Sequence, residues 1–243
     1  MTSFKTIDGT IVPTVTAEQM RRVDEVAVQE FGIDLLQMME NAGRNLARHA
    51  MDMLGSESSK APILIAAGAG GNGGGGLCCA RHLHNRGCSV VILLDRDPDL
   101  FQGVPKRQLH ILETAGIKPI SLERGEELFQ SAGLLIDALI GYSLRGAPRD
   151  VASRLIEGMC RSGNPVLSLD IPSGTDATTG EIPGQVVRPS RTLTLALPKT
   201  GLSETPGDLY LADIGLPPEL FRNVGISFPQ IFRNNDTVRL FRD

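Results

Sequence analysis

The sequence predicts an α/β fold: a Rossmann-like three-layer αβα sandwich with a mostly parallel sheet and two N-terminal helices. Three observations lead to this class. From Pro62 onward, short apolar runs alternate with segments of helical length, a run of glycines follows the first apolar run, and two amphipathic segments precede it. Strands that alternate with helices form a parallel sheet covered by helices on both faces.

Two helices are predicted ahead of the first strand, after a polar N-terminal stretch that we expect to be mobile. The first begins at Thr16, because Gln19 three residues later completes a capping box. Gly32 ends this helix, and apolar residues at helical spacing over residues 36–50 predict the second. A serine-rich loop over residues 55–60 then leads into the sheet.

Seven short apolar segments are predicted as strands, with helices between the first five. They are Ile63–Ala67, Ser89–Leu94, Lys118–Ser121, Leu134–Leu139, Pro165–Leu169, Thr192–Leu197 and Leu209–Ile214. The early segments are continuously apolar, as expected of strands with helices on both faces. Only a loop separates the last two, so we expect the sheet to close with a hairpin. The whole chain, residues 1–243, is predicted to form a single domain.

Composition limits the partners of the protein. Its formal net charge is −4 with a pI near 5.6, which argues against nucleic acid or an anionic membrane as a partner, because phosphate groups are bound by clustered Lys and Arg. The sequence has no secretory pattern at its start and no apolar run long enough to span a bilayer. We therefore expect a protein of the cytoplasm or an organelle that is not secreted.

The cysteines and histidines show no metal-binding or redox spacing. The four cysteines form no C-x-x-C pair, and the four histidines form no H-x-x-x-H pair and no His–Cys pattern. We therefore predict reduced, structural thiols and assign no chemistry to the histidines.

A glycine-rich segment follows the first predicted strand. Seven of the nine residues from Gly68 to Gly76 are glycines, and Gly68, Gly70 and Gly73 satisfy G-x-G-x-x-G. Glycine allows positive φ and the close approach of a ligand to backbone N–H groups, and a helix N-terminus stabilises anions. Because a tight turn needs fewer glycines, we prefer a phosphate site to a purely structural turn. Asp95, after the next strand, stands about where a ribose-binding acid would.

Two later strands end in carboxylates, Asp137 and Asp170. Ligands of doubly wound sheets collect at the carboxyl ends of the strands, so both acids are expected to face the same crevice as the glycine segment. Asp170 is a candidate for acid/base catalysis. The alternative is that it only caps the turn over residues 172–174, where Pro, Ser and Gly are ordinary turn residues.

Oxygen-bearing side chains also gather in this region of the predicted fold. Asn72, Asp137 and Ser173 would bring ligands from three loops to one place, which suits a hard cation without redox chemistry. Asp137 can equally be a carboxylate that accepts hydrogen bonds from loop amides. The sequence leaves both interpretations open.

Together, these segments resemble the NAD(P)HX epimerases, the YjeF N-terminal domain family. The resemblance includes Thr16–Met20, Met39–Gly43, the glycine segment with Leu77–Leu83, Asp137–Gly141 and Leu169–Gly174. It implies an isomerase of metabolite repair, which interconverts the R and S epimers of hydrated NADH or NADPH so that a dehydratase on a separate chain restores the cofactor. A homodimer is also implied.

The resemblance implies roles for individual residues. Asp170 matches the acid/base residue that contacts the substrate, and Asn72, Asp137 and Ser173 match ligands of a potassium ion. The positions implied to bind the nucleotide, besides Asp170, are Gly71, Asn72, Gly73, Gly74, Gly75, Gly141, Tyr142, Ser143, Leu144, Arg145, Gly146 and Ala147.

Two positions depart from the family pattern, in which Asn and Asp stand where this chain has Gly71 and Gly75. The missing acid removes a polar contact and adds backbone freedom, which leaves a non-catalytic nucleotide-binding or scaffold module as the alternative. A third hypothesis is an NAD-dependent dehydrogenase, based on the G-x-G-x-x-G match and Asp95. It ranks lowest, because the sequence shows no evident catalytic group of His, Lys and Tyr for hydride transfer.

Overall fold

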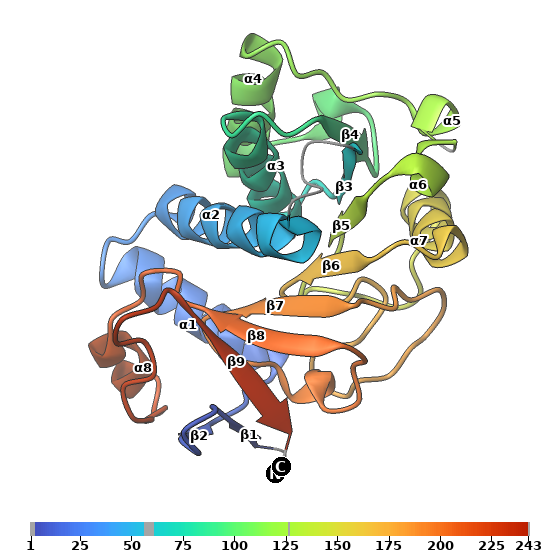
Figure 1. Cartoon of the computed structure of the whole chain (residues 1–243). Coiled ribbons are helices and arrows are strands. Elements are labelled where there is room, and N and C mark those ends of the chain that lie inside the picture. Colours follow the sequence, from blue (N-terminus) through green and yellow to red (C-terminus); the bar gives the residue numbers. More distant parts are fainter. Residues whose placement is uncertain (1–2, 56–60, 126, 243) are drawn as a thin grey trace.

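The computed structural model describes residues 3–55, 61–125 and 127–242. These residues form a nine-stranded sheet in the order β2-β1-β9-β8-β7-β6-β5-β3-β4 (Figure 1). The strands are β1 (Phe4–Lys5), β2 (Ile11–Val12), β3 (Ile63–Ala67), β4 (Val90–Leu94), β5 (Leu134–Ala138), β6 (Val166–Leu169), β7 (Arg191–Leu195), β8 (Asp208–Ala212) and β9 (Thr237–Arg242). The stretch from β8 through β7, β6, β5 and β3 to β4 is parallel, which confirms the predicted mixed α/β fold.

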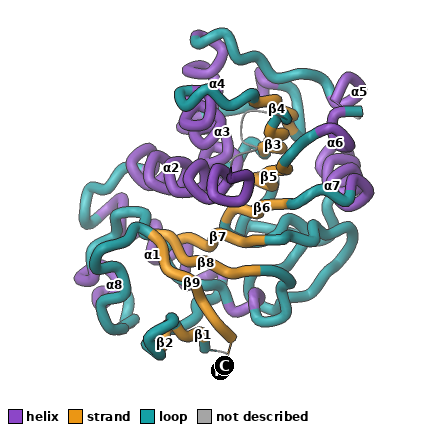
Figure 2. Tube along the Cα trace, in the orientation of Figure 1, coloured by secondary structure: helices purple, strands orange, loops and turns teal. Residues whose placement is uncertain are grey.

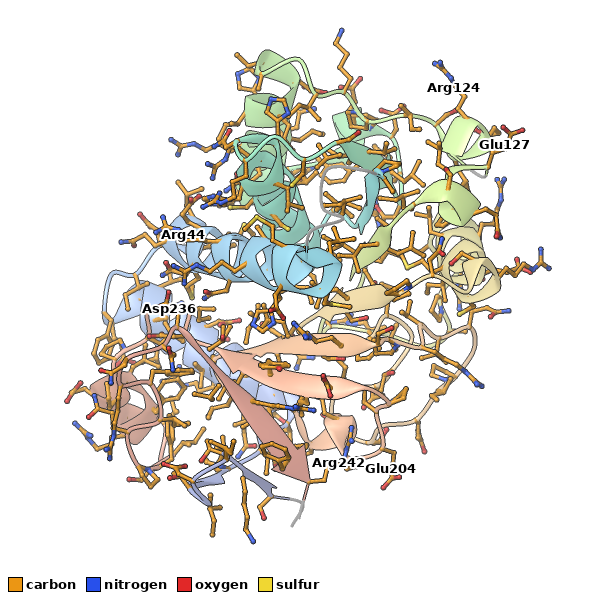
Figure 3. All side chains as sticks on the ribbon, viewed as in Figure 1. Arg44, Arg124, Glu127, Glu204, Asp236 and Arg242 are labelled. Carbon is orange, nitrogen blue, oxygen red and sulfur yellow. The ribbon has the colours of Figure 1, made fainter. Side chains whose placement is uncertain are left out.

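Helices cover both faces of this sheet (Figure 2). They are α1 (Ala17–Gln29), α2 (Leu35–Leu54), α3 (Gly71–His84), α4 (Gly103–Thr114), α5 (Leu122–Gly125), α6 (Leu128–Ser131), α7 (Asp150–Ser162) and α8 (Pro218–Asn223). Short 3-10 turns lie at Pro98–Leu100 and Thr200–Leu202. Charged side chains such as Arg124, Glu127 and Glu204 project outward from this assembly (Figure 3).

The alternation of side chains along β3 explains the layers. Ile63 and Ile65 pack into a core with α2, α3 and α4, whereas Leu64 and Ala66 pack on the opposite face with α6 and α7. Both sets are fully buried. A third core joins α1, α8 and the first half of α2, through Met38 and Ala42, to the C-terminal strands, so α2 contributes to two cores.

The N-terminal helices begin as predicted. The Thr16 hydroxyl accepts from the Gln19 N–H at 3.2 Å, and the Gln19 side chain accepts from the Thr16 N–H at 2.9 Å, which completes the capping box. The stretch before α1, however, was wrongly expected to be mobile. Phe4 is fully buried, and β1 pairs with β9 and β2, because this aromatic side chain fills the core beneath α1 and α8. Of the predicted serine-rich loop, residues 56–60 lie outside the described residues.

Two strand predictions need correction, and three strands, β1, β2 and β9, were not predicted. β7 and β8 are parallel, with Leu193 opposite Tyr210, because residues 196–207 form a crossover instead of a hairpin turn. The segment 118–121 makes only one bridge, from Ile120 to Leu93, since Pro119 lacks the N–H that a longer ladder requires. The antiparallel strand β9 was not predicted, because Thr237 and Arg239 alternate with apolar residues and weaken the apolar signal of the segment.

Candidate active site

A cavity of about 1380 Å³ opens at the carboxyl ends of the parallel strands. Its walls come from α1, the start of α3, the loop after β5, the residues that follow β4 and Asp170 after β6. Gly70, Gly71 and Asp170 therefore line one space, as predicted, whereas Asp137, which was expected to face the same crevice, is fully buried and is not part of the lining. Within the described residues, no helix combines the length and apolar character that crossing a bilayer requires.

The structure separates the predicted substrate-binding residues into two groups. Those that line the cavity are Gly71, Asn72, Gly75, Gly141, Tyr142, Ser143, Leu144, Arg145, Ala147 and Asp170, whereas Gly73, Gly74 and Gly146 are not part of its lining. Gly73 and Gly74 are buried inside α3, and Gly146 adopts a φ of +69° in the loop after β5. The glycine turn and this loop thus reach the cavity through some of their residues only.

The glycine segment forms the first turns of α3. Gly70 is the N-cap, and the first hydrogen bond of the helix runs from the Gly74 N–H to the Gly70 carbonyl at 3.0 Å. The N–H groups of residues 71–73 precede this bond and have no acceptor inside the helix. Since Gly70, Gly71 and Asn72 line the cavity, the positive end of the helix dipole opens into it. This arrangement stabilises an anion.

The glycines are needed for close packing rather than for positive φ, which corrects the sequence argument. None of the glycines from Gly68 to Gly76 lies in the left-handed region. A Cβ at Gly73 would lie 1.6 Å from the Gly68 carbonyl oxygen, and one at Gly68 would lie 2.1 Å from the Leu139 oxygen. Farther along α3, Gly74 and Gly76 let the helix pack closely against α2 and β5. Packing therefore explains five of the seven glycines, and Gly70 and Gly71 at the exposed helix start have room for a Cβ.

The two departures from the family pattern lie in different environments. A Cβ at Gly71 would meet only the Met39 methyl carbon, 4.0 Å away, so this position has room for a side chain. Gly75 is buried in the second turn of α3, where a Cβ would lie 2.8 Å from a methyl group of Leu169. Gly75 therefore does not add backbone freedom, because helical hydrogen bonds and packing fix its conformation.

Asp170 occupies a constrained position directly after β6. Its backbone has a φ of +66°, in the left-handed region, and its N–H donates to the Leu193 carbonyl at 2.7 Å. The carboxylate oxygen Oδ1 accepts from the Lys199 ammonium and from the Leu195 N–H at 3.2 Å. Backbone strain of this kind is often found at functional sites. Here it directs the carboxylate toward the cavity and toward Lys199.

Lys199 is a functional candidate that the sequence analysis missed. Its side chain is 1% exposed, and its Nζ donates both to Asp170 and to the Leu195 carbonyl at 2.9 Å. A single lysine has no spacing pattern, and only its place at the end of the apolar segment 192–198 marks it in the sequence. Burying an ammonium is costly unless a charge partner is present, and Asp170 supplies that charge.

Tyr142 and Asp24 form a second polar pair in the cavity. The Tyr142 hydroxyl donates to Asp24 Oδ2 at 2.5 Å, and the Lys199 Nζ lies 6.0 Å from the centre of the tyrosine ring. Burial raises the pKa of Asp24, while the hydrogen bond from Tyr142 and the charge of Lys199 oppose this shift. Burial also raises the pKa of Tyr142, with the Asp24 charge acting in the same direction. Tyr142 belongs to the predicted set, whereas Asp24 lies on α1 and was not foreseen.

Two of the three predicted cation ligands are in direct contact. The Asp137 carboxylate accepts hydrogen bonds from the hydroxyl of Ser173 at 2.5 Å, the N–H of Ser173 at 2.9 Å and the hydroxyl of Ser168 at 2.8 Å. Asp137 is fully buried, and burial raises its pKa against the effect of these hydrogen bonds. Asn72 lies beside Gly141, and its amide nitrogen is buried without a hydrogen-bond partner among the described residues.

A separate polar cluster connects α2 to α3. The Glu40 carboxylate accepts from Arg81, contacts a ring nitrogen of His82 at 2.8 Å and accepts from the Cys78 thiol at 3.3 Å. The spacing of Cys78 and His82 on one helix face is a His–Cys pattern that the sequence analysis overlooked. Burial raises the pKa of Cys78 to about 12, so its thiol stays protonated. Because Arg81 already forms an ion pair with the Glu40 carboxylate, we interpret the cluster as a structural contact that holds α2 against α3.

Fold and site together define a class of protein: a Rossmann-like enzyme with a buried Asp–Lys pair beside an anion-stabilising helix start. Residues 35–201 match the family described as YjeF-related protein N-terminus, and the chain belongs to that family. This confirms the resemblance inferred from the sequence motifs.

Known proteins similar to this chain carry two kinds of name. A protein of Dehalogenimonas lykanthroporepellens named NAD(P)H-hydrate epimerase is 47% identical over 98% of this chain and 96% of its own length. One of Truepera radiovictrix with the same name is 37% identical over 87% of this chain and 94% of its own length. A Moorella thermoacetica protein named bifunctional NAD(P)H-hydrate repair enzyme Nnr is 34% identical over 85% of this chain, but this match covers only 41% of that protein.

The fold itself has a solved counterpart. The crystal structure of the yeast protein YNL200c superposes with a TM-score of 0.84, covering 94% of this chain and all of that one, at 23% identity. At this level of identity, the likeness supports the architecture and not the activity.

Proposed function

We propose that this chain epimerises hydrated NADH and NADPH, the activity for which its relatives are named. One observation carries the proposal: a buried carboxylate, Asp170, paired with Lys199, lines the same cavity as the open N-terminus of α3. An acid/base group and an anion site in one cavity are what a reaction on a pyrophosphate-linked nucleotide requires.

In this proposal the nucleotide pyrophosphate binds at the N–H groups of residues 71–73, and the loop over residues 141–147 covers the nicotinamide end. Asp170 exchanges a proton with the C6 hydroxyl of the hydrated ring. The carboxylate takes the proton of the C6 hydroxyl, the C6–N1 bond opens to give an aldehyde, and the proton passes to the ring nitrogen. Reclosure on the opposite face of the aldehyde returns the proton from the nitrogen to the C6 oxygen. Loss of the C6 oxygen as water and addition of water to the opposite face gives the same result when Asp170 first carries the proton. Neither route changes the composition of the substrate.

Lys199 acts through Asp170 as a positioning residue. The Lys199 ammonium contacts the Asp170 carboxylate and neutralises the negative charge of that carboxylate in the interior. Together with the Leu195 N–H, the ammonium fixes the orientation of the carboxylate. Tyr142 lies over the same ammonium and is held by Asp24, so one wall of the reaction space is rigid. General acid/base catalysis by a positioned group contributes about 10²- to 10⁴-fold in rate.

We further propose that Asn72, Asp137 and Ser173 hold a potassium ion. The residues fit such an ion, because a fully buried carboxylate and a serine hydroxyl offer hard oxygen ligands. Turned so that its oxygen faces the ion, the Asn72 amide, whose nitrogen now lacks a partner, would add a third oxygen. The bound ion would supply a positive charge that fixes the glycine turn against the loop after β5.

The partners in this proposal are a dehydratase on a separate chain and a second copy of the protein. Relatives with the bifunctional name are longer than this chain and unite two activities, which supports a functional link to a dehydratase. The alternative of a non-catalytic module is less favoured, since a module without chemistry has no need for a strained, buried Asp170–Lys199 pair.

A coupled assay tests the activity. Hydrated NADPH, supplied as a mixture of epimers, is treated with an excess of a dehydratase specific for the S form, and consumption of the remaining R form is followed after addition of this protein. We expect the wild type to accelerate that consumption, Asp170→Asn to lower the rate at least about 100-fold, and the surface variant Asp236→Asn to match the wild type. No acceleration by the wild type would refute the proposal.

A further inference from the structure

Asp95 and Arg96 form an ion pair at the end of the cavity that the proposed chemistry does not use. Asp95 directly follows β4, and its N–H donates to the Ala67 carbonyl at 3.1 Å, so its backbone is tied to β3. Its carboxylate oxygens accept from Arg96 Nε at 3.0 Å and Nη2 at 2.8 Å. The Asp95 side chain is 7% exposed and that of Arg96 is 51% exposed, and both line the cavity.

The order of the strands gives the distance between the two ends of the cavity. Asp170 follows β6 and Asp95 follows β4, with β5 and β3 between them. Three spacings of roughly 4.8 Å between adjacent strands amount to about 14 Å. The helix start at Gly71 follows β3 and therefore lies between the two acids.

An extended dinucleotide fits this arrangement in one direction. It has a nicotinamide ring at one end, a pyrophosphate in the middle and an adenosine at the other end. If the ring lies at Asp170 and the pyrophosphate at the start of α3, as in the proposed function on which this inference rests, the adenosine ribose lies over the end of β4. Asp95 and Arg96 are the charged residues after this strand that line the cavity.

We infer that Asp95 and Arg96 form the subsite for the 2′ position of the adenosine ribose. The Asp95 carboxylate accepts a hydrogen bond from the 2′-hydroxyl of hydrated NADH, and the Arg96 guanidinium binds the 2′-phosphate of hydrated NADPH. A carboxylate alone would repel that phosphate. The Arg96 guanidinium, which donates two hydrogen bonds to Asp95, compensates the charge of that carboxylate and removes the repulsion. The subsite therefore accepts both substrates.

The geometry of Arg96 suits this double role. A guanidinium has five N–H donors, and the contacts with Asp95 use two nitrogens on one side of the group. The other side remains for a phosphate, which planar guanidinium groups bind in a bidentate manner. Because half of the side chain is exposed, it can turn toward the ligand while Asp95 stays anchored to β3.

Two variants with opposite expected effects test the subsite. Arg96→Gln is expected to raise the KM for hydrated NADPH about 10- to 100-fold relative to the KM for hydrated NADH, as expected for the loss of charged hydrogen bonds. Asp95→Ala is expected to move the same ratio in the other direction, because it removes the partner of the 2′-hydroxyl and leaves the Arg96 guanidinium free for the phosphate. The control is Arg222→Gln, whose exposed side chain pairs with Glu219 outside the cavity and whose ratio should equal that of the wild type.

Binding measured without turnover separates this inference from the proposed function. Isothermal titration of the full chain with ADP-ribose and with its 2′-phosphate should show that Arg96→Gln weakens binding of the phosphorylated probe selectively. If the wild type binds the probes and epimerises both substrates but neither variant shifts the ratios, the subsite is overturned and the proposed function stands. If the wild type binds neither probe and shows no epimerisation, both are overturned.

Discussion

The Lys199 ammonium donates to the Asp170 carboxylate in the interior of the protein, where the two side chains are 1% and 6% exposed. The pair joins a residue after β6 to one in the crossover between β7 and β8, so folding of the C-terminal half of the sheet assembles it. Each charge depends on the other, because an isolated ion in this position would lack solvation.

This dependence predicts how stability responds to substitution. Lys199→Met leaves the Asp170 carboxylate buried without its counter-ion, and should lower the free energy of unfolding by about 3–5 kcal/mol. The double variant Asp170→Asn/Lys199→Met removes both charges and should recover most of that loss. Urea unfolding of the two variants and the wild type measures this. Equal stability of Lys199→Met and wild type would show that the pair contributes nothing.

Lys199 should also affect catalysis through Asp170. If Lys199 positions Asp170, Lys199→Met lowers kcat by about 10-fold or more, because the acid/base group loses its orientation. The change in KM is smaller. Steady-state kinetics with purified R epimer and excess dehydratase separates the two parameters. A rise in KM at unchanged kcat would contradict this role and would assign Lys199 to substrate binding.

The glycine turn provides a contrast between two neighbouring positions. Gly73→Ala places a methyl group 1.6 Å from the Gly68 carbonyl oxygen, and should destabilise the protein by about 3 kcal/mol or more. Gly71→Ala meets only the end of Met39 and should stabilise α3 by up to ~1 kcal/mol. Thermal unfolding of both variants tests the comparison. Equal effects of the two substitutions would mean that backbone contact does not set the requirement for glycine.

His49 makes stability depend on pH below neutrality. Burial and the nearby Arg191 charge lower its pKa from 6.5 to about 4, and Arg191 donates to its Nδ1 at 3.2 Å. Since the unfolded chain binds the proton more tightly, the stabilisation is present above pH 6.5 and is lost as the pH falls toward 4. This loss amounts to about 3 kcal/mol. The variant His49→Gln should show a flatter pH profile of unfolding free energy between pH 7 and 4, and an unchanged slope would contradict the assignment.

Asp24 has the opposite dependence. Its pKa is raised, mainly by burial, so its contribution to stability is present at low pH and is lost as the pH rises through the folded-state pKa. Asp24→Asn keeps an acceptor for the Tyr142 hydroxyl and removes the charge. We expect the variant to be more stable than the wild type at pH 8, with the difference shrinking toward acid pH. A variant that is less stable at pH 8 would show that the carboxylate is favoured in its ionised form.

The parts of the site that follow strand order could be predicted from the sequence. Gly71 and Asp170 follow apolar strands, and parallel strands present these ends at one edge of the sheet, whereas Asp137 lies within β5 and is buried away from the cavity. Lys199 and Asp24 could not be found in this way. Lys199 reaches Asp170 only because residues 196–207 cross over instead of turning back, and Asp24 meets Tyr142 because α1 packs beside the loop after β5. Such contacts depend on tertiary packing, which leaves no local pattern.

The glycine segment shows a different limit. From the composition of this segment we predicted the helix start correctly. We explained the glycines by the approach of a ligand, whereas in the structure they allow close packing against Met39, Leu169 and Ala138. Composition alone does not distinguish these causes, because both need a backbone without Cβ atoms.

A crystal structure of the Asp170→Asn variant with hydrated NADPH tests the central claim most directly. We expect the pyrophosphate at the N–H groups of residues 71–73, and the C6 oxygen within about 2.6–3.2 Å of the residue 170 side chain. A nucleotide bound with its nicotinamide ring away from residue 170, or with its pyrophosphate away from the start of α3, would contradict the account.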